Sequence, residues 1–114
     1  MIKKDTFMYD ENTDRLMISC KKQGDIIYGS VRVLNVTLDF TTNNKIVNVE
    51  IRNVSEYLSS LGLNASILSD LEDANLISKQ YRDGYLIYFL LKPAHGNIER
   101  VPFNVPMNKV LATP

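Results

Sequence analysis

Alternating hydrophobic and polar residues run through the first part of the chain and predict antiparallel strands. Two short alternating runs, at residues 7–9 and 15–21, flank Glu11–Asp14, whose side chains favour turns. A four-residue loop at this place pairs Tyr9 with Leu16 across the two strands. Apolar partners then fall opposite each other, which supports this register.

The clearest alternation covers residues 31–40 and 45–52, which we predict to be two paired strands. The intervening Asn43–Asn44 pair suits a two-residue turn, because Asn tolerates positive φ better than most residues. This turn sets Phe40 opposite Val47 and makes one face of the hairpin wholly apolar. The opposite, polar face carries four candidate site residues, which are Asp39, Asn48, Glu50 and Arg52.

Capping residues predict one or two short helices in the middle of the chain. Asn53 or Ser55 can cap the first helix, and Gly62 suits the position just beyond its C-terminal end. Asn64 can cap the second helix in the same way. The sequence therefore predicts a short helical segment between the earlier strands and the later ones.

A second hairpin is predicted from residues 76–82 and 85–92, which flank the turn signal Asp83-Gly84. Residues 99–105 form the last strand. Pro102 places that strand at the edge of a sheet, because proline cannot donate a hydrogen bond to a ladder.

Together these elements predict an α+β fold, which is mostly antiparallel β-sheet. About seven strands are arranged as hairpins, with one or two short helices between the first and last hairpins. No linker divides the chain, so we expect a single domain over residues 1–114. A barrel, a sandwich and an open sheet are all compatible with this pattern.

The strand at residues 85–91 is apolar on both faces, and such a strand is normally covered on both sides. The helices and the other hairpin can cover one side, but so few short helices can hardly cover both. We therefore expect a second copy to cover the other face, in a homodimer or another homo-oligomer. The candidate oligomer surface consists of Tyr85, Ile87, Phe89, Leu91, Val101 and Phe103.

The residues from Phe7 to Ile51 resemble a small uncharacterised family, a domain of unknown function with the pattern YD…D…L.I…LD…G.IVGIEI. The remainder of the chain is similar to the longer, archaeal-type members, which add a helical turn and a second hairpin ending near a VP segment. Asn44 and Asn48 stand where the family usually has glycine. The matching positions are Tyr9-Asp10, Asp14, Leu16, Ile18, Leu38-Asp39, Ile46-Val47 and Val49-Glu50-Ile51.

Composition indicates a globular domain and disfavours nucleic-acid binding. The 114 residues are 45% hydrophobic and 23% charged, which is typical of a globular domain and not of a disordered chain. Thirteen basic and thirteen acidic residues give a net charge of zero. This balance disfavours nucleic-acid binding, which needs a basic excess or stripe, and permits self-association.

Localisation follows from what the sequence lacks. Residues 1–6 do not have the long apolar stretch of a signal peptide, and no apolar run approaches membrane-spanning length. Cys20 is the single cysteine, so no intrachain disulfide can form. We expect a cytoplasmic protein with no membrane association.

Few residues carry recognisable chemistry. Asp10 begins a stretch with oxygen-bearing side chains like a calcium-binding loop, but Arg15 occupies the position of the essential glycine. We instead expect Asp10 to accept a backbone N–H within the turn and Asp14 to end it. His95 and Cys20 lack the spaced partners of a metal site or a nucleophilic pair. No cofactor is expected.

The function that best fits these observations is non-catalytic protein binding or self-assembly. The resemblance implies no activity, because none is established for the family, and its short bacterial members look like suspected partners of toxin-like proteins. One alternative is a small enzyme that uses Asp39 and Glu50 for acid–base chemistry, since a pocket can push the pKa values of two carboxylates apart. A second alternative is nucleic-acid binding, if folding gathers Arg and Lys on one face.

Overall fold

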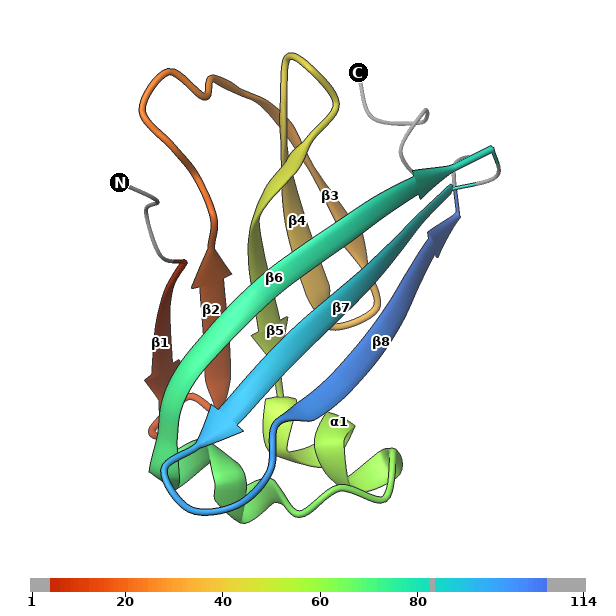
Figure 1. Ribbon diagram of the computed structural model, residues 1–114. Helices are drawn as coiled ribbons and strands as arrows, with labels where there is room; N and C mark the ends of the chain where they lie inside the picture. The colour runs from red at the N-terminus through yellow and green to blue at the C-terminus, as the bar shows by residue number, and fades with distance from the viewer. Residues whose placement is uncertain (1–4, 83, 107–114) are drawn as a thin grey trace.

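The alternating segments fold into two antiparallel sheets that face each other across a shared hydrophobic core (Figure 1). The computed structural model describes residues 5–82 and 84–106, the last three by their backbone only. The first sheet has five strands in the order β1-β2-β5-β4-β3, and the second has three in the order β6-β7-β8. The predicted α+β fold is confirmed, and the two packed sheets make it a sandwich.

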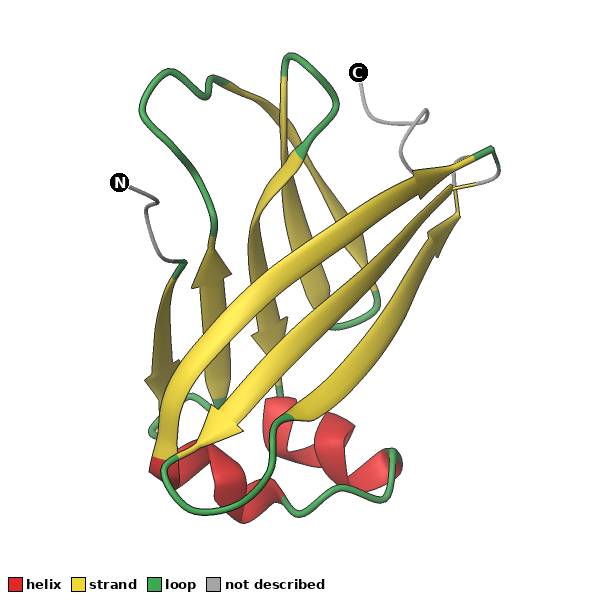
Figure 2. Cartoon of the chain, viewed as in Figure 1, coloured by secondary structure: helices red, strands yellow, loops and turns green. Residues whose placement is uncertain are grey.

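The chain completes the first sheet before it enters the second. The first sheet contains β1 (Thr6–Asp10), β2 (Arg15–Ser19), β3 (Ile27–Val33), β4 (Val36–Thr41) and β5 (Ile46–Arg52). Two short helices follow, α1 (Val54–Ser60) and the 3-10 helix η1 (Ala65–Asp70). The second sheet contains β6 (Leu71–Tyr81), β7 (Gly84–Pro93) and β8 (Glu99–Pro106). Figure 2 shows both helices at one end of the molecule, at the bottom of the view.

Aromatic contacts hold the two sheets and the first helix together. The ring centroid of Phe40 in β4 lies 5.5 Å from that of Tyr85 in β7. Tyr57 of α1 contacts Phe103 of β8 at 6.3 Å between ring centroids, and its hydroxyl donates to the carbonyl oxygen of Pro102 at 3.1 Å. The largest fully buried side chains belong to both sheets and include Phe89, Leu16, Ile18, Leu38, Ile46 and Ile51.

The first hairpin has the predicted register. β1 and β2 pair with Tyr9 opposite Leu16, and the four-residue turn ends at Asp14 with φ of 54°. β2 then pairs with β5, where Leu16 lies opposite Ile51. The apolar face of the first hairpin therefore continues into the apolar face of the central one.

The single strand predicted over residues 31–40 was wrong, because it is two strands. β3 ends at Val33, and a turn at residues 34–35 leads into β4. Leu34 adopts φ of 56° in this turn and is 83% exposed. Positive φ usually calls for Gly, Asn or Asp, so a leucine gives no turn signal in the sequence. The first sheet consequently has five strands, and the described residues form eight strands in all.

The central hairpin has the predicted polar face but a different turn. Asp39 pairs with Asn48 as predicted, whereas Phe40 pairs with Ile46 instead of Val47 because a β-bulge intervenes. The loop has three residues and only Asn44 has positive φ, at 61°. A three-residue loop of this kind combines an ordinary turn with one left-handed residue, whereas the predicted two-residue turn needs two.

The helices begin and end near the predicted residues. Asn53 stands at the N-cap position of α1, although its side chain makes no capping hydrogen bond. Gly62 follows the helix with φ of 79° and donates its N–H to the carbonyl oxygen of Ser59. The Asn64 side chain accepts the N–H of Ser66 and so caps η1 as predicted.

The last hairpin is longer than predicted, because β6 begins directly after η1 at Leu71. The turn residue Asp83 lies outside the described residues. Among the described strands, β8 pairs only with β7 and is an edge strand, as its proline predicted.

The oligomer surface proposed from the sequence lies in the interior instead. Alternation along β7 turns one face toward the first sheet, and the residues predicted to form the oligomer surface lie on that face. The side chains concerned, all buried, are Tyr85, Ile87, Phe89, Leu91, Val101 and Phe103. The other face of β7 carries the half-buried Leu86, Tyr88 and Leu90.

Candidate functional site

The outer face of the first sheet is hollowed. Side chains that alternate with the core residues of β1, β2, β4 and β5 surround a hollow of about 390 Å³. Met8, which is 55% exposed, and Met17 line its apolar part. The polar part is lined by Ser19, Asp39, Asn48 and Glu50. Three of the four polar-face residues singled out from the sequence therefore lie around one hollow.

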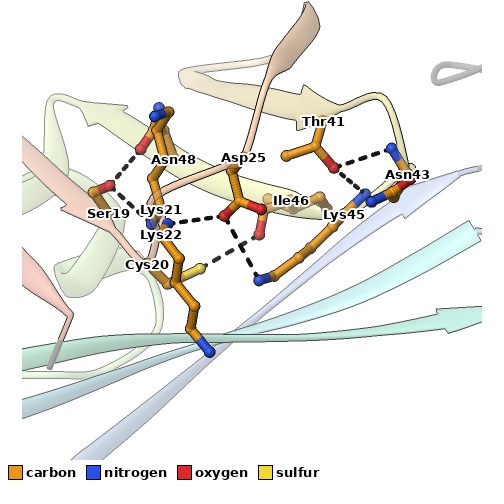
Figure 3. Close-up of polar contacts among 10 residues, drawn as sticks. All are labelled: Ser19, Cys20, Lys21, Lys22, Asp25, Thr41, Asn43, Lys45, Ile46 and Asn48. Carbon is orange, nitrogen blue, oxygen red and sulfur yellow. Dashed lines mark hydrogen bonds and ion pairs between the residues drawn. The ribbon is translucent and has the colours of Figure 1, made fainter. Parts of the chain in front are cut away.

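The Asp39 carboxylate accepts hydrogen bonds from side chains of both neighbouring strands. Ser30 Oγ donates to its Oδ1 at 2.6 Å, and Asn48 Nδ2 donates to its Oδ2 at 3.0 Å. Ser19 Oγ in turn donates to Asn48 Oδ1 at 2.5 Å, a contact visible in Figure 3. This chain of hydrogen bonds crosses β3, β4, β5 and β2, so it ties together four of the five strands.

Glu50 has a different partner. Its Oε1 lies 3.4 Å from Arg15 Nη1, and both side chains are partly exposed. Such an exposed ion pair contributes roughly 0–1 kcal/mol. In the strand register Glu50 faces Thr37, while Asp39 faces Asn48, so the two carboxylates are not directly opposite. Each carboxylate therefore interacts with its own neighbours, Asp39 through hydrogen bonds and Glu50 through an ion pair.

Arg52 lies at the margin of this face. It is opposite Arg15 in the β2–β5 register, and it is not among the residues that line the hollow. Its backbone N–H donates to the carbonyl oxygen of Asn35 at 2.9 Å. Its Nη2 atom is buried and makes no hydrogen bond within residues 5–82 and 84–103.

A second polar cluster joins the first hairpin to α1, and sequence reasoning missed it. The Asp14 carboxylate accepts the backbone N–H of Ser55 at 3.2 Å and its Oγ–H at 2.6 Å. Tyr9 OH donates to the same carboxylate at 2.9 Å. The residue that ends the first turn therefore caps a helix that begins 40 residues later, which no local pattern could indicate.

Burial and the neighbouring carboxylate change the acidity of Tyr9. Desolvation and the hydrogen bond to Asp14 raise the pKa of Tyr9 to about 12. The phenol therefore stays protonated and remains a donor to Asp14 at neutral pH. Asp10, at the other end of the turn, accepts the N–H of Asn12 at 3.0 Å.

Cys20 and the acidic residues that the structure describes do not assemble into a metal site. Cys20 Sγ donates to the carbonyl oxygen of Ile46 at 3.5 Å, and burial raises the pKa of its thiol (Figure 3). Within the described part of the chain, no three His, Cys, Asp or Glu residues lie close enough to hold a metal ion. None of the helices in that part is long and apolar enough to cross a membrane.

Comparison with known proteins identifies a matching family. The family model of a protein of unknown function (DUF2283) matches residues 7–55, which confirms the resemblance to an uncharacterised small-domain family. No curated protein and no solved structure matches the chain. The matched segment runs from β1 to the start of α1, so it contains nearly all of the hollow and both ends of the Tyr9–Asp14–Ser55 cluster.

Proposed function

We propose that the protein is a non-catalytic protein-binding module of the cytoplasm, and that the hollow on the first sheet is its binding surface. The observation that carries this proposal is the placement of the hollow. Apart from Thr6, its lining residues lie within the segment that matches the family. A surface feature built by that segment is the best candidate for a role shared by the family.

The chemistry of the hollow favours a protein partner. Met8 and Met17 are flexible and polarisable, and methionines are common on surfaces that adapt to a partner. Asp39 and Glu50 add negative charge at the polar end. A lysine or arginine of a partner fits this arrangement, because its aliphatic stem can pack on the methionines while its charged end faces a carboxylate.

An acid–base enzyme is less well supported by the same geometry. Both oxygens of Asp39 accept hydrogen bonds from Ser30 and Asn48, and Glu50 faces Arg15. A substrate would have to displace these neighbours from both carboxylates. A protein side chain, in contrast, can dock beside them.

Affinity capture with paired variants tests the binding surface. Met17→Asp places a charge in the apolar part of the hollow, and Ile98→Asp places one at an exposed position in the loop before β8. We expect partners selected from a displayed peptide library to bind the wild type and Ile98→Asp but not Met17→Asp. Equal binding by all three folded proteins would contradict the assignment.

We further propose that the protein forms a homodimer. Support comes from the zero net charge and from the exposed apolar side chains that flank β3, including Tyr28 and Leu34. Light scattering coupled to size-exclusion chromatography measures this directly. A strict monomer at high micromolar concentration would contradict the homodimer and leave the hollow to be judged by its own test.

A further inference from the structure

The proposed homodimer needs a surface, because the residues first considered for it are buried in the core. We infer that two copies pair edge to edge through β3, antiparallel and about a two-fold axis at Val31, to make one continuous sheet of two copies. This inference rests on the proposed self-association and is independent of binding at the hollow.

Among the strands that the structure describes, β3 is the least protected edge. Pro102 and Pro106 lie on β8 and cannot donate to a further strand. On β6, the backbone N–H of Leu76 donates to Asp5 Oδ2 at 2.9 Å, next to β1, so the β1 and β6 edges lie against each other. Within the described residues, β3 carries no proline and pairs with β4 alone, and its one irregularity is a β-bulge between Ile27 and Gly29, outside the segment from Ser30 to Arg32. Exposed edges of this kind readily pair with another strand.

Exposed apolar side chains flank this edge on both ends. Ile26 is 65% exposed and Tyr28 63% exposed at the start of β3, and Leu34 is 83% exposed just after its end. Isolated exposed apolar residues are ordinary, but several along one free strand indicate a surface that becomes covered.

The free backbone groups of β3 can be assigned from its neighbours. The Asn35 carbonyl accepts from Arg52 of β5, and the Thr41 N–H donates to Lys45, so the odd-numbered residues of β4 face β5. The even-numbered residues of β4 therefore face β3, where they pair with Gly29, Val31 and Val33. Ser30 and Arg32, which alternate with these three residues, direct their N–H and C=O groups away from the sheet.

Antiparallel pairing of two β3 strands can satisfy these groups. A two-fold axis at Val31 sets Ser30 of each copy opposite Arg32 of the other, where both can exchange two hydrogen bonds. The same register brings Tyr28, at a β-bulge near the start of β3, close to Leu34 of the second copy, in the turn that follows β3, so these two exposed apolar side chains can cover each other. An axis at Arg32 would place two like charges opposite each other and is disfavoured.

Charge also fits this register. Ser30 lies between Arg32 of the second copy and Asp39 of its own, because Ser30 pairs with Asp39 in β4. Two strand spacings separate the Arg and Asp positions, about 10 Å, which the long arginine side chain can partly bridge. The dimer therefore brings opposite charges together across the new sheet junction.

The start of β3 is held in place before any pairing. Asp25 Oδ2 accepts the N–H of Lys22 at 2.8 Å and lies 3.9 Å from Lys45 Nζ (Figure 3). The N–H of Thr42 donates to the carbonyl oxygen of Ile26 at 3.1 Å. An edge that is already ordered loses less conformational entropy when a second strand adds to it.

Proline substitution at the free edge tests the inference. Arg32→Pro removes an N–H that makes no bond within the sheet, and Arg32→Thr removes the charge but keeps that N–H. Two hydrogen bonds are lost per dimer in Arg32→Pro, so we expect its association constant to fall at least about tenfold, with Arg32→Thr much closer to the wild type. Circular dichroism checks that both variants fold, and light scattering over a concentration series measures association.

Disulfide trapping tests the register without relying on that variant. In a Cys20→Ser background, Val31→Cys meets itself across the two-fold axis at a spacing that suits a disulfide, whereas Val33→Cys meets Gly29. We expect rapid covalent dimer from Val31→Cys and little from Val33→Cys.

The outcomes separate the two proposals. A dimer that survives in Arg32→Pro with an unchanged association constant, or equal trapping at residues 31 and 33, would overturn pairing through β3 while self-association stands. A wild type that stays monomeric and traps at neither position would overturn self-association itself. Loss of dimer in Arg32→Pro together with selective trapping at residue 31 supports the inference.

Discussion

Asp14 connects more of the molecule than any other residue in the first turn. Its carboxylate binds the backbone and hydroxyl of Ser55 and the hydroxyl of Tyr9, while its own carbonyl oxygen accepts the N–H of Val54. The residue also adopts φ of 54°, which Asp tolerates better than most residues. This cluster gives a structural reason for the Tyr9-Asp10 and Asp14 positions in the family pattern.

Replacement of Asp14 should therefore destabilise the fold. We expect Asp14→Ala to lower the free energy of unfolding by roughly 1–3 kcal/mol, because it removes the helix cap and leaves Tyr9 without its acceptor. Asp14→Asn keeps one oxygen acceptor and the tolerance of positive φ, so its loss should be smaller. Asp10→Ala is the matched control, since Asp10 accepts a hydrogen bond from within the turn. Urea denaturation measures all three, and an effect of Asp10→Ala as large as that of Asp14→Ala would contradict the capping role.

The raised pKa of Tyr9 makes stability depend on alkaline pH. The folded state holds the phenol proton more tightly than the unfolded chain, where the pKa is near 10.0, because the folded value is about 12. This contribution is complete below pH 10 and is lost as the pH rises through 12. We expect Tyr9→Phe to flatten the fall in stability over this range, and tyrosinate absorbance to show one late-titrating group fewer. The control is Tyr28→Phe, which removes an exposed tyrosine, and an identical change in both variants would contradict the assignment.

For individual residues, the sequence predicted contacts between neighbouring strands of one hairpin. It did not predict contacts between residues far apart in the chain. The opposition of Tyr9 and Leu16 follows from loop length and alternation, both of which are local. The bond between Asp14 and Ser55 depends on how two hairpins and a helix pack, so neither residue signals it. The polar face with Asp39 and Asn48 was predictable, because a two-residue period places alternate side chains together.

At the scale of secondary-structure elements, turns set where each strand ends. In the central hairpin, a single turn residue also links the loop to the second sheet. Asn44 alone has positive φ in its three-residue loop, and its carbonyl oxygen accepts the hydroxyl of Tyr85 at 2.8 Å. The buried Thr41 supports the loop through its Oγ1, which accepts the N–H groups of Asn43 and Lys45 (Figure 3). The loop is therefore linked to the second sheet as well as to the first.

Substitutions at the two asparagines distinguish this loop from a two-residue turn. We expect Asn44→Ala to cost about 1 kcal/mol, because alanine is strained at positive φ, and Asn44→Gly to be neutral or slightly stabilising. Asn43→Gly should destabilise slightly, because Asn43 does not have positive φ and glycine loses more entropy on folding. Thermal unfolding measures each variant. Stabilisation by Asn43→Gly would indicate the two-residue turn instead.

Leu34 offers a prediction in which two measurements move in opposite directions. Leucine at φ of 56° is strained, so Leu34→Asn should raise the stability of the folded monomer by roughly 0.5–1 kcal/mol. The same change removes an exposed apolar side chain that lies close to Tyr28 in the proposed dimer, so self-association should weaken. Thermal unfolding at low concentration and light scattering at high concentration separate the two effects. A variant that is less stable as a monomer would contradict the strain at this turn.

The missed turn between β3 and β4 shows why strand boundaries were harder to predict than strands. Apolar residues recur from Val31 to Phe40 with only a change from odd to even positions at Leu34, and neither Leu34 nor the residues beside it are Gly or Pro. Packing of β3 and β4 on the core imposes the turn at a residue that does not favour it. Packing also accounts for the bulge at Phe40, which the sequence did not predict. The bulge lets both Ile46 and Val47 be buried.

At the scale of the whole molecule, the two sheets depend on each other. The segment that matches the family forms the first sheet except for Thr6, yet the inner face of this sheet is covered by β6, β7 and β8, which lie outside that segment. The hollow occupies the outer face of the first sheet and the free β3 edge lies at its end. A partner in the hollow and a second copy at the edge would therefore use different sides of one sheet.

This dependence predicts that the first sheet cannot fold by itself. In a chain that ends at Gly62, the inner-face residues Leu16, Leu38 and Ile51 would lose their cover, and each such side chain contributes roughly 1.5–3 kcal/mol when buried. These three losses alone are comparable to the typical stability of a small domain, about 5–15 kcal/mol, and other buried residues of the same sheet, such as Ile18 and Val49, add to them. We expect the shortened chain to give a poorly dispersed amide NMR spectrum or to aggregate through the uncovered face. Addition of residues 63–114 as a separate chain should restore dispersion, because it returns the missing sheet. A dispersed spectrum and cooperative unfolding from the shortened chain alone would show instead that the pairing of five strands, with α1 at one end, is sufficient for folding.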